Sequence, residues 1–244
     1  MSSEQLAETN KLPEQVKVEV RTTADGSPTL YVPTLDEHYH SRHGARQESA
    51  HVFIEAGLRP LLEAGLGQGE PLRVLEVGLG TGLNALLTLE ASGAVAGTAV
   101  AYDGYETYPL PAEAVAALAS QWSGSQVLSR AFAQLHREPW DRALLLTKDF
   151  LLRKVRLPIQ AATLPAAAYN LIYFDAFAPE KQPELWTEAV FAHLYAAAAP
   201  GAVLVSYCAQ GQFRRNLRAA GWLTERLPGP PGKREMTRAR KPLP

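Results

Sequence analysis

The feature that most constrains this fold is an apolar run at residues 72–77 that leads directly into a turn with glycine at every second position. The run predicts a buried parallel strand, because apolar side chains occupy most of its positions. Gly78, Gly80 and Gly82 form the turn, and a helix is expected directly after them. Such a turn lets backbone N–H groups and a helix N-terminus approach a ligand where a Cβ would collide. The stretch therefore predicts a nucleotide-type cofactor.

Strand and helix patterns alternate from residue 70 onward. Further strands are expected near 98–102, 142–147, 169–175 and 202–207, with helices near 83–91, 109–122, 125–137, 183–198 and 213–220. Segments 222–227 and 235–238 are expected to pair as a closing hairpin. Near-continuous apolar strands that alternate with helices are typical of a sheet covered on both faces. The predicted fold class is α/β, Rossmann-like, with a mostly parallel twisted sheet.

The N-terminal part has a different pattern. Residues 16–22 alternate with period two, Asp25 and Gly26 offer a turn, and an extended segment follows at 29–33. These signals predict a small β-hairpin, and a helical pattern follows at 47–62. We therefore divide the chain into an N-terminal extension with a β-hairpin, residues 1–34, and a main domain, residues 35–244.

Composition excludes several classes of protein. The single cysteine, Cys208, excludes an internal disulfide and a cysteine-rich zinc motif. The N-terminus has neither a basic nor an apolar leader segment, and the apolar runs stop well short of the roughly 20 residues that a membrane span needs. We expect a soluble cytoplasmic protein with no membrane contact.

Positive charge is concentrated at the C-terminal end. The net charge is −1, yet residues 210–244 contain nine lysines and arginines against Glu225 and Glu235. Such an end is either a surface for a polyanion or a solvated tail, and charge alone does not separate the two.

The spacing of the glycines indicates which cofactor is bound. A dinucleotide fingerprint has the pattern G-x-G-x-x-G, whereas here the third glycine comes one residue early and Glu76 precedes the turn. The pattern E-x-G-x-G-x-G resembles the first motif of Rossmann-like S-adenosylmethionine-dependent methyltransferases. That cofactor has no pyrophosphate, and we expect Glu76 to receive its positively charged amino group. A dinucleotide is the alternative.

Two carboxylates downstream favour the same cofactor. Glu106 follows the second strand and is expected to accept hydrogen bonds from ribose hydroxyls. Asp149 follows the next strand-like run and is expected to receive the exocyclic amine of adenine. Each is alternatively a solvated surface acid.

The stretch from Phe174 to Trp186 carries the strongest resemblance to a known family. Asp175, Phe177, Pro179, Lys181, Pro183 and Trp186 match the pattern D-x-F-x-P-x-K-x-P-x-x-W. Together with the glycine turn through Asn84, it resembles the MnmD family of tRNA methyltransferases, which is similar to the methyltransferase half of bifunctional MnmC. Further matches lie at Tyr39, Ser41, Gly44, Glu48, Val52 and Phe53, and at residues 232–236. The resemblance spans residues 35–240.

The resemblance implies a reaction. The family transfers a methyl group from S-adenosylmethionine to the primary amine of 5-aminomethyl-(2-thio)uridine at the tRNA wobble position. The residues expected at the cofactor are Glu76, Gly78, Gly80, Gly82, Asn84, Glu106 and Asp149. The bifunctional relative continues into a flavin-dependent domain; since this sequence ends at Pro244, we expect the methyltransferase activity without an FAD site.

Asp175 is the expected catalytic residue. It ends the fourth strand, so its carboxylate is expected to hold the acceptor amine in line with the methyl group and to offset the positive charge that forms. An ordinary carboxylate has a pKa of roughly 4 and is a weak base, so this role concerns orientation more than final acceptance of the proton. The alternative is a structural acid that caps the turn.

A larger set is expected to bind the substrate, tRNA at its anticodon region. The set is Tyr39, Ser41, Glu48, Phe177, Pro179, Lys181, Arg214, Arg215, Lys233 and Arg234. Phe177 and Pro179 either wall the pocket or belong to the core, Lys181 either meets a phosphate or is solvated, and the last four are the candidates for the tRNA backbone. His38, His40, His43 and His51 lie close in sequence, but the resemblance implies no metal.

Two other functions stay open from the sequence. One is a methyl- or aminopropyl-transferase that acts on a small polyamine, which has no need for a basic C-terminal end. The other is a non-catalytic module that binds S-adenosylmethionine or RNA, although the Asp175 pattern argues against it.

Overall fold

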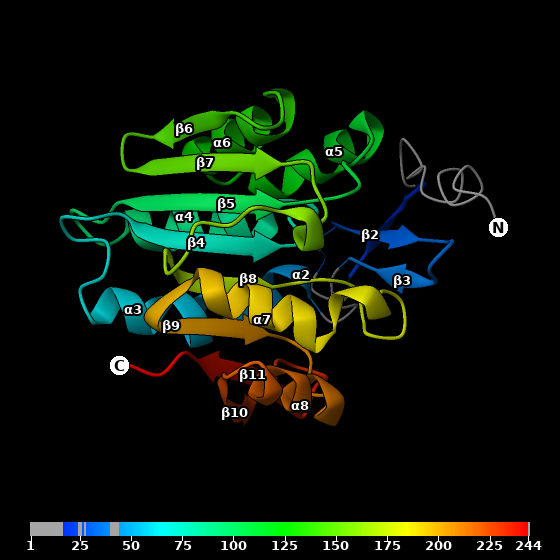
Figure 1. The fold of residues 1–244 in the computed structure, drawn as a ribbon. Coiled ribbons are helices and arrows are strands. Elements are labelled where there is room, and N and C mark those ends of the chain that lie inside the picture. The colour runs from blue at the N-terminus through cyan, green and yellow to red at the C-terminus, as the bar shows by residue number, and fades with distance from the viewer. Residues whose placement is uncertain (1–16, 24–25, 27, 40–43, 244) are drawn as a thin grey trace, which may run out of the picture.

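The protein is built around one eight-stranded sheet (Figure 1). The structure is a computed structural model, and it describes residues 17–23, 26, 28–39 and 44–243. In spatial order the strands are β10 (Leu223–Pro228), β11 (Glu235–Arg240), β9 (Ala198–Ser206), β8 (Tyr169–Phe174), β4 (Leu72–Val77), β5 (Val100–Tyr105), β7 (Phe150–Val155) and β6 (Ala143–Thr147). The strands from β9 to β7 are parallel, and β10, β11 and β6 are antiparallel to their neighbours. The predicted Rossmann-like fold is confirmed.

Helices cover both faces of the sheet (Figure 1). They are α2 (Ala45–Ser49), the π-helix η1 (Ala50–Leu58), α3 (Arg59–Glu63), α4 (Leu83–Gly93), α5 (Ala112–Leu118), η2 (Ala119–Trp122), α6 (Gln126–Arg137), η3 (Ile159–Ala161), η4 (Pro183–Leu185), α7 (Glu188–Ala197) and α8 (Gly211–Ala219). No helix in the described part of the chain is long and apolar enough to span a bilayer.

The core has two halves, one on each face of the sheet. Successive strand residues point to opposite faces, so Val74 packs with η1, α4 and α6, whereas Leu75 packs with α7 and α8. The second half is rich in aromatic rings, and Phe174 contacts Trp186, Phe191 and Phe213. Because both faces are covered, the ligand-accessible part of the sheet is the edge where the parallel strands end.

A small antiparallel sheet lies beside that edge (Figure 1). It consists of β1 (Glu19–Thr22), β2 (Pro28–Val32) and β3 (Glu37–His38), so the expected hairpin is present and has a third strand. Leu30 and Val32 are fully buried. The boundary drawn at residue 34 falls between β2 and β3 of this one sheet, and Val18 and Leu30 of the extension pack with the core of the main domain.

Strand β7 is the main element that the sequence pattern did not predict. Arg153 and Lys154 interrupt its apolar run, and both are compensated by tertiary contacts. Arg153 bonds to Asp103 at 2.8 Å, and the buried Lys154 Nζ donates to the carbonyl of Glu138 at 2.8 Å. Such partners lie far away in sequence, so the pattern alone could not reveal this strand.

Two other elements differ from the prediction. The helix expected at 183–198 is two pieces, η4 and α7, because the Thr187 hydroxyl caps a new helix by accepting from the N–H of Val190. The second strand, β5, continues to Tyr105, three residues beyond its expected end.

The glycine turn joins β4 to α4 and brings the ends of β4 and β8 together. Gly78 has a φ of +88°, and a Cβ there would lie 2.5 Å from the carbonyl oxygen of Asp175. Glycine is therefore required at this position both by the backbone conformation and by the close approach of another backbone segment.

The other two glycines of the turn also lie against side chains of this protein. A Cβ on Gly80 would meet the Tyr39 ring at 3.0 Å, and one on Gly82 would meet Leu135 at 2.9 Å. Packing within the protein thus accounts for all three glycines, in addition to any need for a ligand to approach.

The substitution Gly78→Ala tests this packing against a matched control, Gly65→Ala. Gly65 has a similar φ of +83°, but no atom lies within 4 Å of a Cβ built there. We expect Gly65→Ala to lower the free energy of unfolding by about 1–2 kcal/mol, through the strained backbone alone. Gly78→Ala is expected to lower it by about 1–3 kcal/mol more, through the clash with Asp175. Urea unfolding measures both; equal losses would contradict the close approach.

Candidate active site

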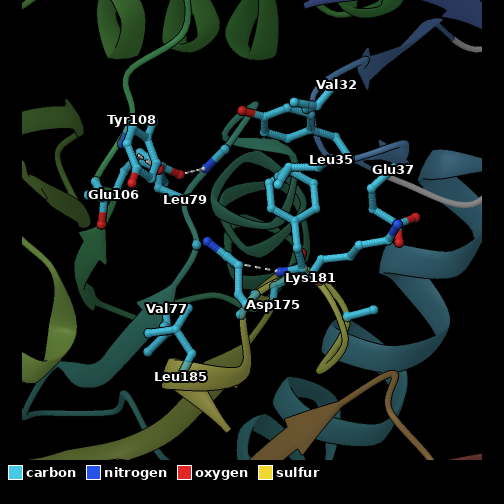
Figure 2. A pocket seen from close by; sticks show the side chains of 18 of the residues that line it. Val32, Leu35, Glu37, Val77, Leu79, Glu106, Tyr108, Asp175, Lys181 and Leu185 are labelled. Atoms are coloured by element: carbon cyan, nitrogen blue, oxygen red, sulfur yellow. Dashed lines mark hydrogen bonds between the residues drawn. The ribbon is translucent and has the colours of Figure 1, made fainter. Parts of the chain in front are cut away.

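The parallel strands end at a cavity of about 580 Å³. Figure 2 shows Glu106 and Tyr108 on one side, Glu37 and Lys181 on the other, and Asp175 between them. Among the described residues the charged side chains of its wall are mainly acidic. The acids are Asp36, Glu37, Glu48, Glu106, Asp175 and Glu184, and the lysines are Lys181 and Lys233. Such a wall favours a cationic ligand.

Glu106 follows β5 and is fixed by the backbone at the cavity wall. Its Oε2 accepts from the N–H of Gly80 at 2.9 Å, and its Oε1 accepts from the N–H of Tyr108 at 2.8 Å. Burial raises the pKa of Glu106, while these hydrogen bonds oppose that effect. The N–H of Thr107 also bonds to this carboxylate, and because a carboxylate has about four acceptor positions, at least one remains for a further donor.

Glu76 lies behind the cavity wall and has no exposed surface. It shares the strand face of Val74, under α4, because it is two residues further along β4. Its Oε2 accepts from the Tyr102 hydroxyl at 2.7 Å, and its Oε1 accepts from Asn84 Nδ2 at 2.8 Å. Burial raises the pKa of Glu76 well above its usual value. The prediction that Glu76 receives the cofactor's amino group directly is wrong, since a side chain without exposed surface cannot contact a ligand.

Asn84 connects this buried acid to the cavity. Its Nδ2 also donates to Asp175 Oδ2 at 2.8 Å, so one amide bridges two carboxylates. Asn84 lines the cavity, and its buried Oδ1 accepts no hydrogen bond within the described ranges of the chain. An acceptor of this kind costs free energy unless a ligand supplies a donor.

Asp175 follows β8 and is held in the cavity wall by a bond from its own N–H to the carbonyl of Val77, at 2.9 Å. Burial raises the pKa of Asp175 to about 7, and the charge of Glu48 adds to this effect. The bond from Asn84 and the Lys233 ammonium lower it. The carboxylate is therefore a stronger base than an ordinary aspartate.

An aromatic pair forms another part of the wall. The rings of Tyr39 and Phe177 lie 5.1 Å apart, edge to face, and both residues line the cavity. The carbonyl of Phe177 accepts from the indole N–H of Trp186 at 2.9 Å, which anchors the segment after Asp175 to the core. Burial raises the pKa of Tyr39, so its hydroxyl stays neutral.

Glu48 and Lys233 meet in the cavity wall. Lys233 Nζ lies 3.1 Å from Glu48 Oε2 and 4.1 Å from the centre of the Tyr207 ring. The Tyr207 hydroxyl donates to the carbonyl of Ala176 at 2.8 Å. The loop between β10 and β11 brings Lys233, which was predicted to contact the tRNA backbone, into the cavity wall. Lys181 also lines the cavity, whereas Pro179 does not.

The prediction for Asp149 is wrong. Asp149 precedes β7, its carbonyl accepts from the N–H of Val100 at the start of β5, and its exposed carboxylate pairs with Lys148. It therefore lies at the amino ends of the parallel strands, opposite the cavity. The error follows from the missed strand, since the run before Asp149 is the antiparallel edge strand β6.

The basic residues near the C-terminus do not form one surface. Arg214 is 6% exposed and faces Glu235 at 3.7 Å, so it is not available as a phosphate contact and that prediction is wrong. Arg215 and Arg234 are exposed, as a contact with nucleic acid requires. Glu225 pairs with Arg238 and Arg240, which lowers the free positive charge of this end.

The remaining points from the sequence are Ser41 as a substrate-binding residue and the group of histidines considered for a metal. Ser41, like His40 and His43, lies outside the described ranges. Among the residues that are described, no three His, Cys, Asp or Glu side chains come close enough to hold a metal ion.

Sequence reasoning missed several residues of the cavity wall. Leu157 and Ile159 follow β7, Tyr207 follows β9, and Tyr108 follows Glu106. All come after the carboxyl end of a parallel strand, so their position relative to a strand end was a usable signal. For Leu157 and Ile159 that signal required the strand that the pattern did not predict.

The cavity fits S-adenosylmethionine on two observations. Its wall is acidic, and this suits the positively charged sulfonium and ammonium groups of the cofactor. The Glu106 carboxylate lines the wall and keeps an acceptor position for a donor group of the cofactor. With Glu76 and Gly82 absent from the wall, Gly78, Gly80, Asn84 and Glu106 are the predicted cofactor residues that line the cavity.

Comparisons with known proteins identify relatives of this chain. Residues 132–242 match a family described as S-adenosyl-L-methionine-dependent methyltransferase. The chain is 36% identical over 227 residues to the tRNA 5-methylaminomethyl-2-thiouridine biosynthesis bifunctional protein MnmC of Cupriavidus necator, covering 88% of this chain and 33% of that protein. It is 33% identical over 206 residues to MnmC of Pseudomonas paraeruginosa, covering 81% and 31%. The chain thus spans about a third of the length of these relatives.

Solved structures share the fold. The crystal structure of MNMC2 from Aquifex aeolicus matches with a TM-score of 0.74 at 24% identity and covers 100% of this chain and 80% of that one. Spermidine synthase from Thermotoga maritima matches with a TM-score of 0.56 at 12% identity, covering 93% and 69%. The family match and the curated relatives together lead to one conclusion: the chain belongs to the S-adenosyl-L-methionine-dependent methyltransferases, in the family that includes the matching third of the MnmC proteins.

Proposed function

We propose that the protein methylates the primary amine of 5-aminomethyl-(2-thio)uridine at the wobble position of tRNA and converts the nucleoside to 5-methylaminomethyl-(2-thio)uridine. The observation that carries the proposal is Asp175, a carboxylate with a raised pKa in an acidic cavity of a methyltransferase. The names of the MnmC relatives point to the same tRNA nucleoside. S-adenosylmethionine would supply an electrophilic methyl group on a sulfonium sulfur.

Under this proposal some cavity residues bind the methyl donor, S-adenosylmethionine, and others bind the nucleoside that accepts the methyl group. Asn84, which lines the cavity, and Glu106, through the remaining acceptor position of its carboxylate, would hold the cofactor. Tyr39 and Phe177 would wall the target base and exclude water from the reacting atoms. Glu48, Lys181 and Lys233 complete the acceptor side of the wall.

Asp175 would remove the proton that blocks the amine. An alkylamine resembles lysine, with a pKa of about 10.4, so its nitrogen is protonated and has no free lone pair at neutral pH. Asp175 accepts that proton, and the neutral nitrogen then forms a bond to the methyl carbon as the carbon–sulfur bond breaks and its electron pair stays on sulfur. The products are a secondary ammonium and a thioether.

The raised pKa makes this proton transfer less costly. The pKa of Asp175 is about 7 instead of 3.8, and one pKa unit corresponds to about 1.4 kcal/mol. Transfer of the amine proton to Asp175 therefore costs roughly 4 kcal/mol less than transfer to an ordinary aspartate. This shift favours Asp175 as the acceptor of the proton, beyond the orienting role expected from the sequence.

The assay for the function uses labelled S-adenosylmethionine and tRNA that lacks only this last methyl group, followed by nucleoside analysis. Label in the wobble nucleoside supports the proposal. Label on a polyamine instead would support the rival transferase, whose fold the spermidine synthases share. No label on either substrate would leave a binding module as the better description.

Asp175→Asn separates the proton acceptor from the hydrogen-bond partner. An asparagine still accepts the bond from Asn84 but cannot take the amine proton. We expect the single-turnover rate to fall by about 10²–10⁴-fold, with the affinity for S-adenosylmethionine nearly unchanged. Rapid-quench measurement of label transfer and calorimetric titration of the cofactor test both parts. An unchanged rate would remove Asp175 from the chemistry.

The pH dependence follows from the same group. Asp175 acts as a base only when deprotonated, and its pKa is about 7, so activity is expected to rise with pH through that region and to fall about tenfold per pH unit below it. An aspartate with an ordinary pKa would place this fall near pH 4. The measurement is kcat/KM between pH 5 and 8, with cofactor saturating; a flat profile over this range contradicts the assignment.

Arg215 and Arg234 are proposed to contact the tRNA backbone near the anticodon. Both are exposed, and Arg234 follows the cavity residue Lys233. We expect Arg215→Ala and Arg234→Ala each to weaken tRNA binding and to lower the slope of log K against log salt by about one. Lys148→Ala is the matched control, because Lys148 is 88% exposed and lies beside Asp149 at the opposite edge. Equal effects of all three would exclude a local binding surface.

A further inference from the structure

A chain of hydrogen bonds leads from the core to Asp175. The Tyr102 hydroxyl donates to Glu76 Oε2 at 2.7 Å, and Asn84 Nδ2 donates to Glu76 Oε1 and to Asp175 Oδ2, each at 2.8 Å. Tyr102 and Glu76 are 1% and 0% exposed. Neither can touch a ligand, so their route to the cavity is the Asn84 amide, together with the charge interaction between Glu76 and Asp175.

The two carboxylates determine which way the Asn84 amide points. Its –NH₂ group has two hydrogens, and both are directed at carboxylate oxygens. The reversed amide would place Oδ1 against two acceptors and lose both bonds. Glu76 thus adds a second hydrogen bond that fixes the orientation of the Asn84 amide, beside the one to Asp175. The Tyr102 hydroxyl in turn holds the other oxygen of Glu76.

Burying Glu76 is costly, which argues against a purely structural role. A buried carboxyl loses its hydration, and this raises the pKa of Glu76 well above its usual value. An apolar side chain would fill the same space at lower cost. The site instead holds an acid whose two oxygens are both used to orient polar neighbours.

We propose that Glu76 and Tyr102 are positioning residues that fix the Asn84 amide, and that this amide holds the Asp175 carboxylate in the orientation needed to accept the proton of the substrate amine. The proposal rests on the proposed function for the identity of that amine. It replaces the direct cofactor contact expected of Glu76 with an indirect action through one amide.

Other charged groups also face Asp175. Glu48 from α2 raises the pKa of Asp175, Lys233 from the β10–β11 loop lowers it, and Tyr207 after β9 lies close to it. Within the described residues, however, Asn84 is the side chain that donates a hydrogen bond to the Asp175 carboxylate. Removing that donor would therefore let burial and the charge of Glu48 raise the pKa of Asp175 further.

The test compares Asn84→Ala, Glu76→Leu and Glu76→Gln with a control, Thr88→Val. Thr88 is fully buried on the same helix. Its hydroxyl donates to the main-chain carbonyl of Asn84 at 2.7 Å and pairs with the Tyr173 hydroxyl at 3.1 Å, so Thr88→Val leaves the bonds of the Asn84 amide in place. The first readout is the single-turnover rate of methyl transfer with cofactor saturating. The second is the pKa of Asp175, measured by NMR titration of its labelled carboxyl carbon.

Asn84→Ala and Glu76→Leu are expected to lower the rate on the order of 10- to 100-fold, as a small misplacement of a catalytic group does. Asn84→Ala is also expected to raise the pKa of Asp175. Glu76→Gln retains an acceptor for the amide and is expected to keep most of the rate, and Thr88→Val is expected to resemble the wild type.

Rates for Asn84→Ala and Glu76→Leu that match Thr88→Val, with an unchanged pKa of Asp175, would overturn the proposal. If Glu76→Leu does not fold, Asn84→Ala and Glu76→Gln decide the outcome. If the wild-type protein does not methylate this tRNA, the proposed function fails, and the NMR titration still decides whether Asn84 controls Asp175.

Discussion

The interaction on which the rest of the site depends is one side-chain amide between two carboxylates. Asn84 bonds to Glu76 in the core and to Asp175 in the cavity. Two acids so close together would repel each other if both were charged, and each lies where burial raises its pKa. The amide donates a hydrogen bond to each acid, which stabilises the two carboxyl groups at short range. Of the two, Asp175 is the one that lines the cavity and that a ligand can reach.

The backbone geometry that permits this arrangement comes from the glycine turn. Gly78 lets the end of β4 pass within contact distance of the Asp175 backbone, and α4 then begins at Leu83, so Asn84 lies in its first turn. The acid on β4, the amide on α4 and the acid after β8 thereby meet, although 91 residues separate Asn84 from Asp175. A parallel sheet makes this possible because neighbouring strands end at the same edge.

Charge is distributed differently inside and outside the cavity. The wall is acidic, which suits a cationic cofactor and a cationic amine, whereas exposed arginines on α8 and in the β10–β11 loop suit an anionic backbone. Several basic residues that were grouped by sequence separate in space: Lys233 enters the cavity, Arg214 is buried, and Arg215 and Arg234 face solvent. A polyanion would therefore meet positive charge beside the cavity and negative charge within it.

The sequence by itself determined the fold class, the glycine turn and the place of Asp175, since these depend on local patterns: apolar runs, glycine spacing and an acid at a strand end. It misplaced Asp149 because Arg153 and Lys154 break the pattern of β7, and their partners come from distant segments. It also assigned Glu76 to the ligand, although strand alternation turns that side chain under α4. Only the tertiary structure decided which acids face the cavity and how far burial raises their pKa values, because desolvation and hydrogen-bond partners arise when distant segments pack together.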